Sequence, residues 1–429
     1  MRPYDVLDLY ELMKNQWRKP EELAEIQVKK LQKLVRHAYE EVPYYRRLFD
    51  SVKLTPSDIK DISDLTKIPI TSKEQLVSLP LKEITAGGVD LDYCRVTTTS
   101  GTTGVPIKTY YRRRDFTLMN LGWARAYLAH GMKPWYRIGA FSGWPSISPK
   151  PSWYEYIGLW RRKVLSSLDS PDIWISELRK WRPQVITGYV MNLKLLAFAI
   201  QEHGDSDIRP QLIFSTSAIL DDYSRKFITD VFKEKVVDIY GSNEGGCIAW
   251  ECPQCNGYHV NIDMLVLEIL ENGKSVPPGK EGEVVITNLH SYAMPLIRYR
   301  LGDIGTLSPE VPSCGRGMPL LKEITGRIDD FIVLPSGKRI SPHPFYHALR
   351  WVRGIAKWRI IQEENGILKV EVVVSKDFSY NGSSLIEANL RKIFDDKLKI
   401  EISIVAEIKQ DPSQKFRSVI SKVKKADLI

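Results

Sequence analysis

The sequence has 429 residues, of which 43% are hydrophobic, and a formal net charge of +9. This length and composition are ample for a buried core and predict a globular protein of two or three domains. No window approaches the roughly 18 uninterrupted apolar residues of a membrane-spanning helix, and residues 1–5 show no signal-peptide pattern, so we expect a cytoplasmic protein without a membrane partner. The basic cluster at residues 112–114 comes without an RNA-binding or zinc-finger signature, so we expect solvated surface there and no nucleic-acid binding.

The first hundred residues are rich in charged side chains and predict helices. Residues 20–41 carry apolar side chains at helical spacing, at Leu23, Ile26, Val28, Leu31, Leu34 and Val35. Because one face of such a helix is apolar and the other is charged, we expect this segment to act as a scaffold packed on the rest of the protein.

From about residue 95 to 305, short apolar strands alternate with helical segments. The clearest strands are residues 184–187, 211–214 and 236–240. This alternation predicts a largely parallel α/β layer, with ligands bound where the strands end. Beyond residue 330 the pattern changes to two strands, a helix and a strand. We therefore predict a large α/β domain over residues 1–328 and a small α+β domain over residues 329–429.

A run of hydroxyl residues and glycines occupies positions 97–106. Its candidate phosphate-binding residues are Thr99, Ser100, Gly101, Thr102, Thr103 and Gly104. The glycines allow close approach of the backbone to an anion, and the hydroxyl and amide groups can donate to phosphate oxygens. Neither G-x-x-x-x-G-K-[ST] nor G-x-G-x-x-G is present. The run predicts a triphosphate-binding loop of another kind, and the alternative is a polar surface turn.

Four of the five cysteines fall in one third of the chain, which differs from a secreted disulfide framework. Cys252 and Cys255 have the two-residue spacing that lets both thiolates face one zinc ion, and His259 and Cys314 offer further ligands. The fourth ligand stays open between His259 and Cys247. We expect a structural zinc site, with a redox-active cysteine pair as the alternative.

Four further motifs follow in a specific order. They are residues 238–244 (DIYGSNE), 298–303 (RYRLGD), 326–330 (GRIDD) and 412–415 (PSQK). Together with the loop at residues 97–106, they resemble the motifs of the adenylate-forming superfamily of acyl-CoA synthetases. The resemblance covers nearly the whole chain.

The branch that the chain most resembles is that of phenylacetate-CoA ligases and capsule-biosynthesis-type ligases, on segments 251–260, 314–319 and 415–420. This resemblance implies an AMP-binding domain with a zinc-binding insertion, followed by a small mobile lid domain. It also implies an enzyme that uses ATP and Mg²⁺ to activate a carboxylic acid as an acyl-adenylate, releases pyrophosphate, and transfers the acyl group to coenzyme A.

The resemblance also implies roles for single residues. Besides the loop residues 99–104, nucleotide binding is expected from Ser217, Ala218, Tyr240, Gly241, Ser242, Asp303 and Arg327. Catalysis is expected from Lys415, Glu244 and Arg327, with Glu244 as the Mg²⁺ ligand. Asp329 matches the hinge, and Tyr189 is a candidate for the acid pocket. A carboxylate with phosphates and waters suits Mg²⁺, and a lysine suits phosphate.

Three positions depart from the family pattern: Val105 stands where a lysine is common, Gln414 stands where a glycine is common, and Cys314 stands alone where relatives can have paired cysteines. Three alternatives remain open for the function. The acyl group could pass to an amine in polysaccharide or secondary-metabolite synthesis, AMP could pass to a phenolic deazaflavin, or the chain could be a noncatalytic binding protein stabilised by zinc. A homodimer is compatible with the sequence.

Overall fold

The computed structural model describes residues 3–98, 107–142, 152–204, 207–327, 331–336, 339–340, 343–350, 352–364, 366–375, 377–394, 398–409 and 418–423. Two compact units are present. The first comprises the described residues up to Glu323 except Gly302–Ile304, and the second comprises Gly302–Ile304 and the described residues from Ile324 onward.

The elements up to β14 alternate irregularly between helix and strand. The α-helices are α1 (Pro3–Asn15), α2 (Pro20–Glu41), α3 (Pro43–Ser51), α4 (Lys73–Val77), α5 (Leu81–Ile84), α6 (Arg113–Ala129), α7 (Trp153–Tyr156), α8 (Pro171–Trp181), α9 (Val190–Glu202) and α10 (Asp222–Phe232). Short 3₁₀ helices are η1 (Pro56–Asp58), η2 (Ile62–Lys67) and η3 (Leu91–Tyr93). The strands are β1 (Arg95–Thr98), β2 (Lys108–Tyr111), β3 (Ile138–Ser142), β4 (Arg162–Ser166), β5 (Val185–Tyr189), β6 (Leu212–Thr216), β7 (Val236–Ser242), β8 (Gly246–Glu251), β9 (Tyr258–Val260), β10 (Leu265–Glu271), β11 (Lys274–Ser275), β12 (Glu281–Asn288), β13 (Tyr299–Leu307) and β14 (Leu320–Arg327).

A twelve-stranded sheet has the order β11-β10-β12-β13-β14-β9-β8-β7-β6-β5-β3-β4. Strands β4, β3, β5, β6 and β7 run parallel, as the alternation of strands and helices predicts. From β7 onward the pairings β7–β8, β8–β9 and β9–β14 are antiparallel. The expectation of a largely parallel layer up to residue 305 is therefore correct only for the part that ends at β7, because the chain turns back directly after residue 242 instead of crossing over through a helix.

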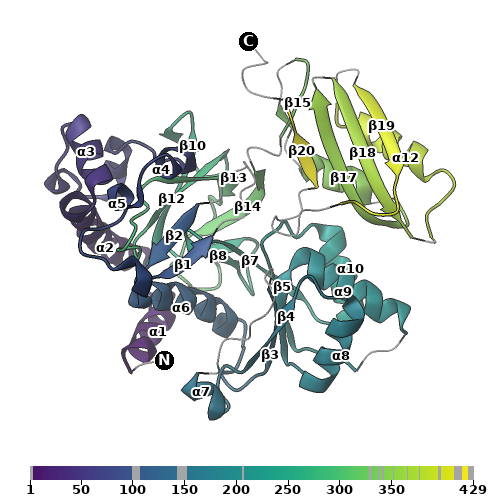
Figure 1. Cartoon of the computed structure of the whole chain (residues 1–429), viewed down its shortest axis with the longest axis horizontal. Helices are drawn as coiled ribbons and strands as arrows, with labels where there is room; N and C mark the ends of the chain where they lie inside the picture. The colour runs from purple at the N-terminus through teal and green to yellow at the C-terminus, as the bar shows by residue number, and fades with distance from the viewer. Residues whose placement is uncertain are drawn as a thin grey trace. The chain divides into compact units, whose positions relative to one another are not determined.

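The parallel strands are buried on both faces. On one face, α8, α9 and α10 pack against them, and Figure 1 shows these helices together beside β3, β4 and β5. Ile186 and Ile213 belong to the core on this face, whereas the neighbouring residues Val185 and Phe214 belong to the core under α6 on the other face. Successive side chains of a strand point to opposite faces, so short apolar runs are what a doubly covered sheet requires.

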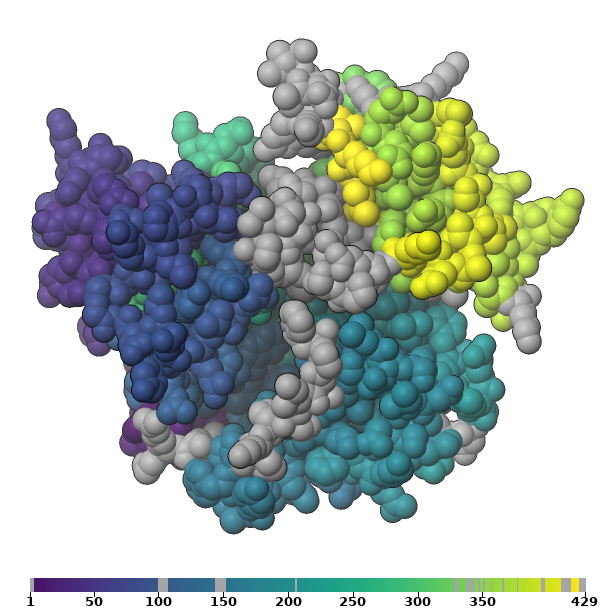
Figure 2. All heavy atoms as spheres, viewed as in Figure 1, coloured from purple at the N-terminus to yellow at the C-terminus, as the bar shows by residue number. Residues whose placement is uncertain are grey.

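The expected helix at residues 20–41 is confirmed as α2, with the same bounds. Leu31 and Leu34 are fully buried in a core shared with residues of β10 and the segment after β12, and Figure 2 shows the surface of this N-terminal segment in purple and blue. Ile26 and Val28 are only half-buried. Gln27 is buried in addition, because its amide donates a 2.8 Å hydrogen bond to the Leu265 carbonyl oxygen.

The second unit contains a four-stranded sheet of order β19-β18-β17-β20. Its elements after β14 are β15 (Ile332–Val333), β16 (Arg339–Ile340), α11 (His343–Arg350), β17 (Ile355–Glu364), β18 (Ile367–Val374), α12 (Gly382–Arg391), β19 (Lys399–Ile404) and β20 (Val419–Ser421). The predicted succession of two strands, a helix and a strand matches β17, β18, α12 and β19, whereas β15, β16, α11 and β20 were not predicted. Within the described part of the chain, no helix is both long and apolar enough to cross a membrane.

Candidate active site and cysteine cluster

Three predicted site positions lie at one end of the parallel strands. Tyr189 is the last residue of β5 and is aligned with Thr216, the last residue of β6. Thr216 is in turn aligned with Ile239 on β7, so that Ser217 and Tyr240 each follow one position later. Because these strands are parallel, their carboxyl ends meet at one edge of the sheet, where ligands of such sheets bind. The parallel register thus brings Tyr189, Ser217 and Tyr240 to one edge.

Ser217 has a φ of 72°, which is uncommon for a residue other than glycine. Its neighbour Ala218 is exposed, and Ser217 itself is half-buried. Left-handed backbone at such a residue costs on the order of 1–3 kcal/mol and concentrates at functional sites. This conformation supports the interpretation of residues 217–218 as a ligand-contacting turn.

Glu244 lies in the tight turn that joins β7 to β8, and it is 8% exposed. In this turn Ser242 pairs with Gly246, which has a φ of 67°. The Ser242 hydroxyl oxygen accepts a 2.9 Å hydrogen bond from the Gly245 amide. The turn therefore places a buried carboxylate directly after the strand that carries Tyr240.

The predicted phosphate loop is flanked by β1 and β2, which pair antiparallel with Thr98 opposite Lys108. The loop residues Thr99, Ser100, Gly101, Thr102, Thr103 and Gly104 lie outside the described residues, as do Asp329 and Lys415. The roles predicted for these eight residues remain predictions.

Asp303 and Arg327 form an ion pair in the second unit. The Arg327 Nε atom lies 3.1 Å from Asp303 Oδ1, and the two side chains are 37% and 16% exposed. The two residues belong to β13 and β14, which are neighbours in the sheet. The pair joins two residues for which the family resemblance implies the same nucleotide ligand.

A buried hydrogen-bond network lies beneath the ends of β6 and β7. Both oxygens of Asp238 accept hydrogen bonds, from Ser215 Oγ at 2.6 Å and from the Tyr258 hydroxyl at 3.0 Å. Burial raises the pKa of Asp238 to about 6, although both hydrogen bonds favour the charged carboxylate. The Asp238 amide donates to Glu251 at 2.9 Å. The network therefore connects β6, which ends just before Ser217, and β7, which carries Tyr240, to the β8–β9 hairpin.

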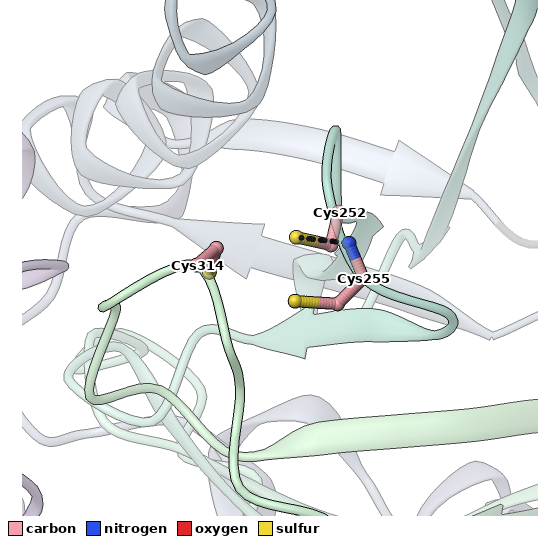
Figure 3. Close-up of side chains that lie close together, drawn as sticks. All are labelled: Cys252, Cys255 and Cys314. Carbon is pink, nitrogen blue, oxygen red and sulfur yellow. Dashed lines mark hydrogen bonds between the residues drawn. The ribbon is translucent and has the colours of Figure 1, made fainter.

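The cysteine cluster forms at the turn after β8. The Sγ atoms of Cys252, Cys255 and Cys314 all lie within 4.8 Å of one another, and Figure 3 shows the three side chains gathered between this turn and the loop before β14. Cys252 Sγ also accepts hydrogen bonds from the amides of Gln254, at 3.4 Å, and Cys255, at 3.2 Å. Residue 314 thus joins a pair that lies some sixty residues earlier in the chain.

His259 lies beside this cluster, with its Nε2 atom 3.3 Å from Cys314 Sγ. Its Nδ1 atom lies 3.3 Å from the Met318 carbonyl oxygen. A carbonyl oxygen can only accept, so Nδ1 carries the proton and the lone pair of Nε2 faces the cysteines. The other candidate, Cys247, is buried on β8 in the hydrophobic core under α6 and is not in the cluster. Of the two candidate fourth ligands, only His259 adjoins the cysteines.

The chain is similar to known CoA ligases over most of its length. The model of the CapK C-terminal domain family matches residues 332–422. The phenylacetate-coenzyme A ligase of Thermus thermophilus is 28% identical over 386 residues, which cover 83% of each chain. A solved 2-hydroxyisobutyryl-CoA ligase, in complex with 2-HIB-AMP in its postadenylation state, superposes with a TM-score of 0.80 at 21% identity, over 97% of this chain and 92% of that one.

The chain belongs to the adenylate-forming superfamily. Its place on the phenylacetate-CoA ligase and CapK branch confirms the resemblance predicted from the motifs, and the mixed α/β class with a small C-terminal α+β unit is confirmed as well. The indoleacetate–lysine synthetase of Pseudomonas savastanoi is also similar, at 33% identity over 112 residues, which cover 25% of this chain and 26% of that relative.

Three residues near Glu244 were not predicted as functional residues from the sequence. Asn243 lies inside the motif at residues 238–244, so the motif itself was the available signal. Tyr111 and Asn288 lie on β2 and β12 and contact the backbone near Glu244, but neither belongs to a motif. Such side chains bond to backbone atoms distant in sequence, and neither periodicity nor spacing reveals these contacts.

Proposed function

We propose that this protein is an AMP-forming ligase that activates a carboxylic acid with ATP and transfers the acyl group to coenzyme A. The observation that carries the proposal is the placement of Glu244 in the turn directly after β7, at the edge where β5 and β6 present Tyr189 and Ser217. The likeness to a phenylacetate-coenzyme A ligase over 83% of both chains supports the same activity.

In the first half-reaction, a carboxylate oxygen of the acid bonds to the α-phosphorus, and the bond from that phosphorus to the bridging oxygen breaks as pyrophosphate departs. The protein contributes mainly positioning and stabilisation of charge on phosphate oxygens. Tyr240 offers a flat face for adenine, and Ser217 and Ala218 would line the base from the turn after β6. The ion-paired Asp303 would accept hydrogen bonds from the ribose hydroxyls. Lys415 would contact the carboxylate and the α-phosphate.

A buried carboxylate such as Glu244 fits Mg²⁺, which takes oxygen ligands and commonly uses one or two protein carboxylates with phosphates and waters. When bound there, Mg²⁺ would neutralise charge on the phosphate oxygens. In the second half-reaction, the thiol sulfur of coenzyme A bonds to the acyl carbon, AMP leaves with the electron pair of the broken acyl–oxygen bond, and the thiol proton goes to solvent. Asp329 is proposed as the hinge for the change between the two steps.

The acid pocket is proposed to take an aryl or arylacetic acid. The likeness to a phenylacetate-coenzyme A ligase over 83% of both chains supports this class of acid. Tyr189, the last residue of β5, is proposed to line the pocket.

We also propose that the cysteine cluster holds a structural zinc ion. Tetrahedral zinc with ordinary bond lengths places two sulfurs about 3.8 Å apart, and sulfur and nitrogen about 3.6 Å apart. The three Sγ atoms lie within 4.8 Å of one another, and His259 Nε2 lies 3.3 Å from Cys314 Sγ but not within 4.8 Å of all three, so the four side chains would have to close further around an ion. Cys252, Cys255, Cys314 and His259 would fill all four positions, so this zinc would stabilise the fold and take no part in the chemistry.

The decisive experiment is pyrophosphate release from ATP and Mg²⁺ across a panel of aryl, arylacetic, fatty and amino acids, with and without coenzyme A. Acid-dependent release that turns over repeatedly only with coenzyme A supports the proposal. Glu244→Gln serves as the matched negative control, because it keeps the size of the side chain and removes its charge. ATP hydrolysis that does not depend on any acid of the panel would contradict the proposal.

An amine acceptor is the second candidate, because the similar relative from Pseudomonas savastanoi is named as an indoleacetate–lysine synthetase. Acid-dependent release that needs an added amine and ignores coenzyme A would select it. A cytoplasmic location belongs to the main proposal, because none of the five cysteines forms a disulfide bond, as is usual in reducing compartments.

A further inference from the structure

Two hydrogen bonds tie the turn that carries Glu244 to the β1–β2 hairpin. The hydroxyl of Tyr111, on β2, donates to the Asn243 carbonyl oxygen at 2.6 Å and lies 3.3 Å from the Glu244 carbonyl oxygen. The Asn243 side-chain amide donates to the Thr98 carbonyl oxygen, on β1, at 2.9 Å. The turn is therefore attached to both strands of the hairpin that flanks the predicted phosphate loop.

Further hydrogen bonds fix the β1–β2 hairpin and the turn that carries Glu244. Thr97 and Thr109 share a 2.6 Å hydroxyl–hydroxyl contact between β1 and β2. From the opposite side, the side-chain amide of Asn288, on β12, donates to the Glu244 carbonyl oxygen at 2.7 Å. The Tyr111 side chain is fully buried, and burial raises the pKa of its hydroxyl, which keeps it protonated as a donor. The Glu244 backbone is thus held between β2 and β12.

Resting on the proposed function, we infer that Tyr111 and Asn243 are positioning residues that hold the turn carrying Glu244 so that its carboxylate engages Mg²⁺–ATP. Neither side chain needs to touch the substrate. Mg²⁺ tolerates little change in the positions of its oxygen ligands, so a small displacement of the turn that carries Glu244 would weaken its binding. Second-layer hydrogen bonds of this kind orient metal ligands, and their loss typically weakens metal binding or activity 10- to 100-fold, as an order of magnitude.

The test uses Tyr111→Phe, which removes only the hydroxyl, with Tyr45→Phe as its matched control. Tyr45 is equally buried, and its hydroxyl also bonds to backbone, donating to the Pro295 carbonyl at 3.1 Å and accepting from the Ile297 amide at 2.9 Å. Both variants should lose a similar amount of thermal stability. Only Tyr111→Phe should raise the Mg²⁺ concentration that gives half-maximal pyrophosphate release, by about 10-fold, and weaken Mg²⁺-dependent ATP binding measured by calorimetry.

A second variant covers the case that Tyr111→Phe does not fold. Asn243 is exposed, so Asn243→Ala removes the bond to Thr98 without opening the core, and Asn120→Ala, which removes another exposed side-chain amide bonded to a backbone carbonyl, is its control. Equal Mg²⁺ midpoints in parent, Asn243→Ala and Tyr111→Phe would overturn the inference, and so would an equal shift in a control. If the parent releases no pyrophosphate but binds Mg²⁺–ATP, the proposed function fails while calorimetry still decides this inference.

Discussion

The guanidinium of Arg125 and the carboxylate of Asp263 form a two-point ion pair, at 2.8 and 2.9 Å, and both side chains are fully buried. Asp263 Oδ2 also accepts from the Asn15 amide at 3.0 Å, and the Asp263 carbonyl oxygen accepts from Lys30 Nζ at 2.7 Å. One acidic residue therefore ties α1, α2 and α6 to the segment before β10.

Asp263→Asn is expected to lower the free energy of unfolding by about 3–5 kcal/mol, because it leaves the Arg125 charge buried without its partner. The measurement is chemical denaturation near neutral pH. Asp230→Asn, which breaks the exposed ion pair with Lys226, is the control and should cost no more than about 1 kcal/mol. Equal effects of the two substitutions would refute a special role for the buried pair.

His290 should make the protein sensitive to acid. Burial, reinforced by the nearby Lys30 charge, lowers the pKa of His290 to about 3. Its pKa rises to about 6.5 on unfolding, so the unfolded state binds the proton first, and stability is lost as pH falls below 6.5 at up to about 1.4 kcal/mol per pH unit. His290→Gln should lose less stability than the parent between pH 7 and pH 5. His203→Gln, at an exposed site, should follow the parent.

The burial of Asp238 makes stability depend on pH in the direction opposite to that of His290. Because its pKa is raised to about 6, its contribution to stability is present at low pH and is lost as pH rises through 6. The His290 prediction is therefore read from the difference between variant and parent at each pH. A parallel pair of stability–pH curves would show that His290 does not carry the effect.

Asp303→Asn should raise the KM for ATP by roughly 10- to 100-fold, because a hydrogen bond to a charged group is worth about 1.5–3 kcal/mol. The substitution also removes the charge that Arg327 pairs with. Initial rates at varied ATP concentration provide the measurement. Glu271→Gln, which breaks the exposed pair with Lys280, should leave the KM unchanged. An unaltered KM for Asp303→Asn would remove this residue from the nucleotide site.

Cys252→Ser should abolish zinc binding and lower the melting temperature on the order of 5–10 °C, because a closed metal site contributes folding free energy. Zinc content is measured by mass spectrometry of the purified protein. Cys94→Ser should retain the metal, since Cys94 is not in the cluster. A pure parent protein without zinc would contradict the proposal.

Lys415→Ala should slow acyl-adenylate formation about 100- to 1,000-fold while leaving ATP affinity nearly unchanged, because the lysine acts on charge that develops during the reaction. Single-turnover pyrophosphate release and equilibrium ATP binding separate the two effects. Lys422→Ala, which breaks the surface pair with Glu363, should behave as the parent. Equal rates for parent and Lys415→Ala would exclude Lys415 from the chemistry.

The local sequence pattern was sufficient to predict the helices and strands that have strong hydrophobic periodicity or runs of β-branched residues. The helix at residues 20–41 and the strands near residues 185, 212 and 236 could be predicted because each pattern spans one element. The reversal from parallel to antiparallel pairing at β7–β8 could not be predicted from the sequence. The direction of a strand depends on which neighbour it pairs with, and a local pattern does not contain this information.

Residue types in order along the chain determined the superfamily and the residues proposed for each role. Only the tertiary structure decided that Asn243 bonds to Thr98, that Cys314 joins Cys252 and Cys255, and that His259 lies beside Cys314 whereas Cys247 is buried elsewhere. The physical reason is that polar side chains gain stability from partners brought close by packing of the whole sheet, and those partners lie from a few to more than a hundred residues away.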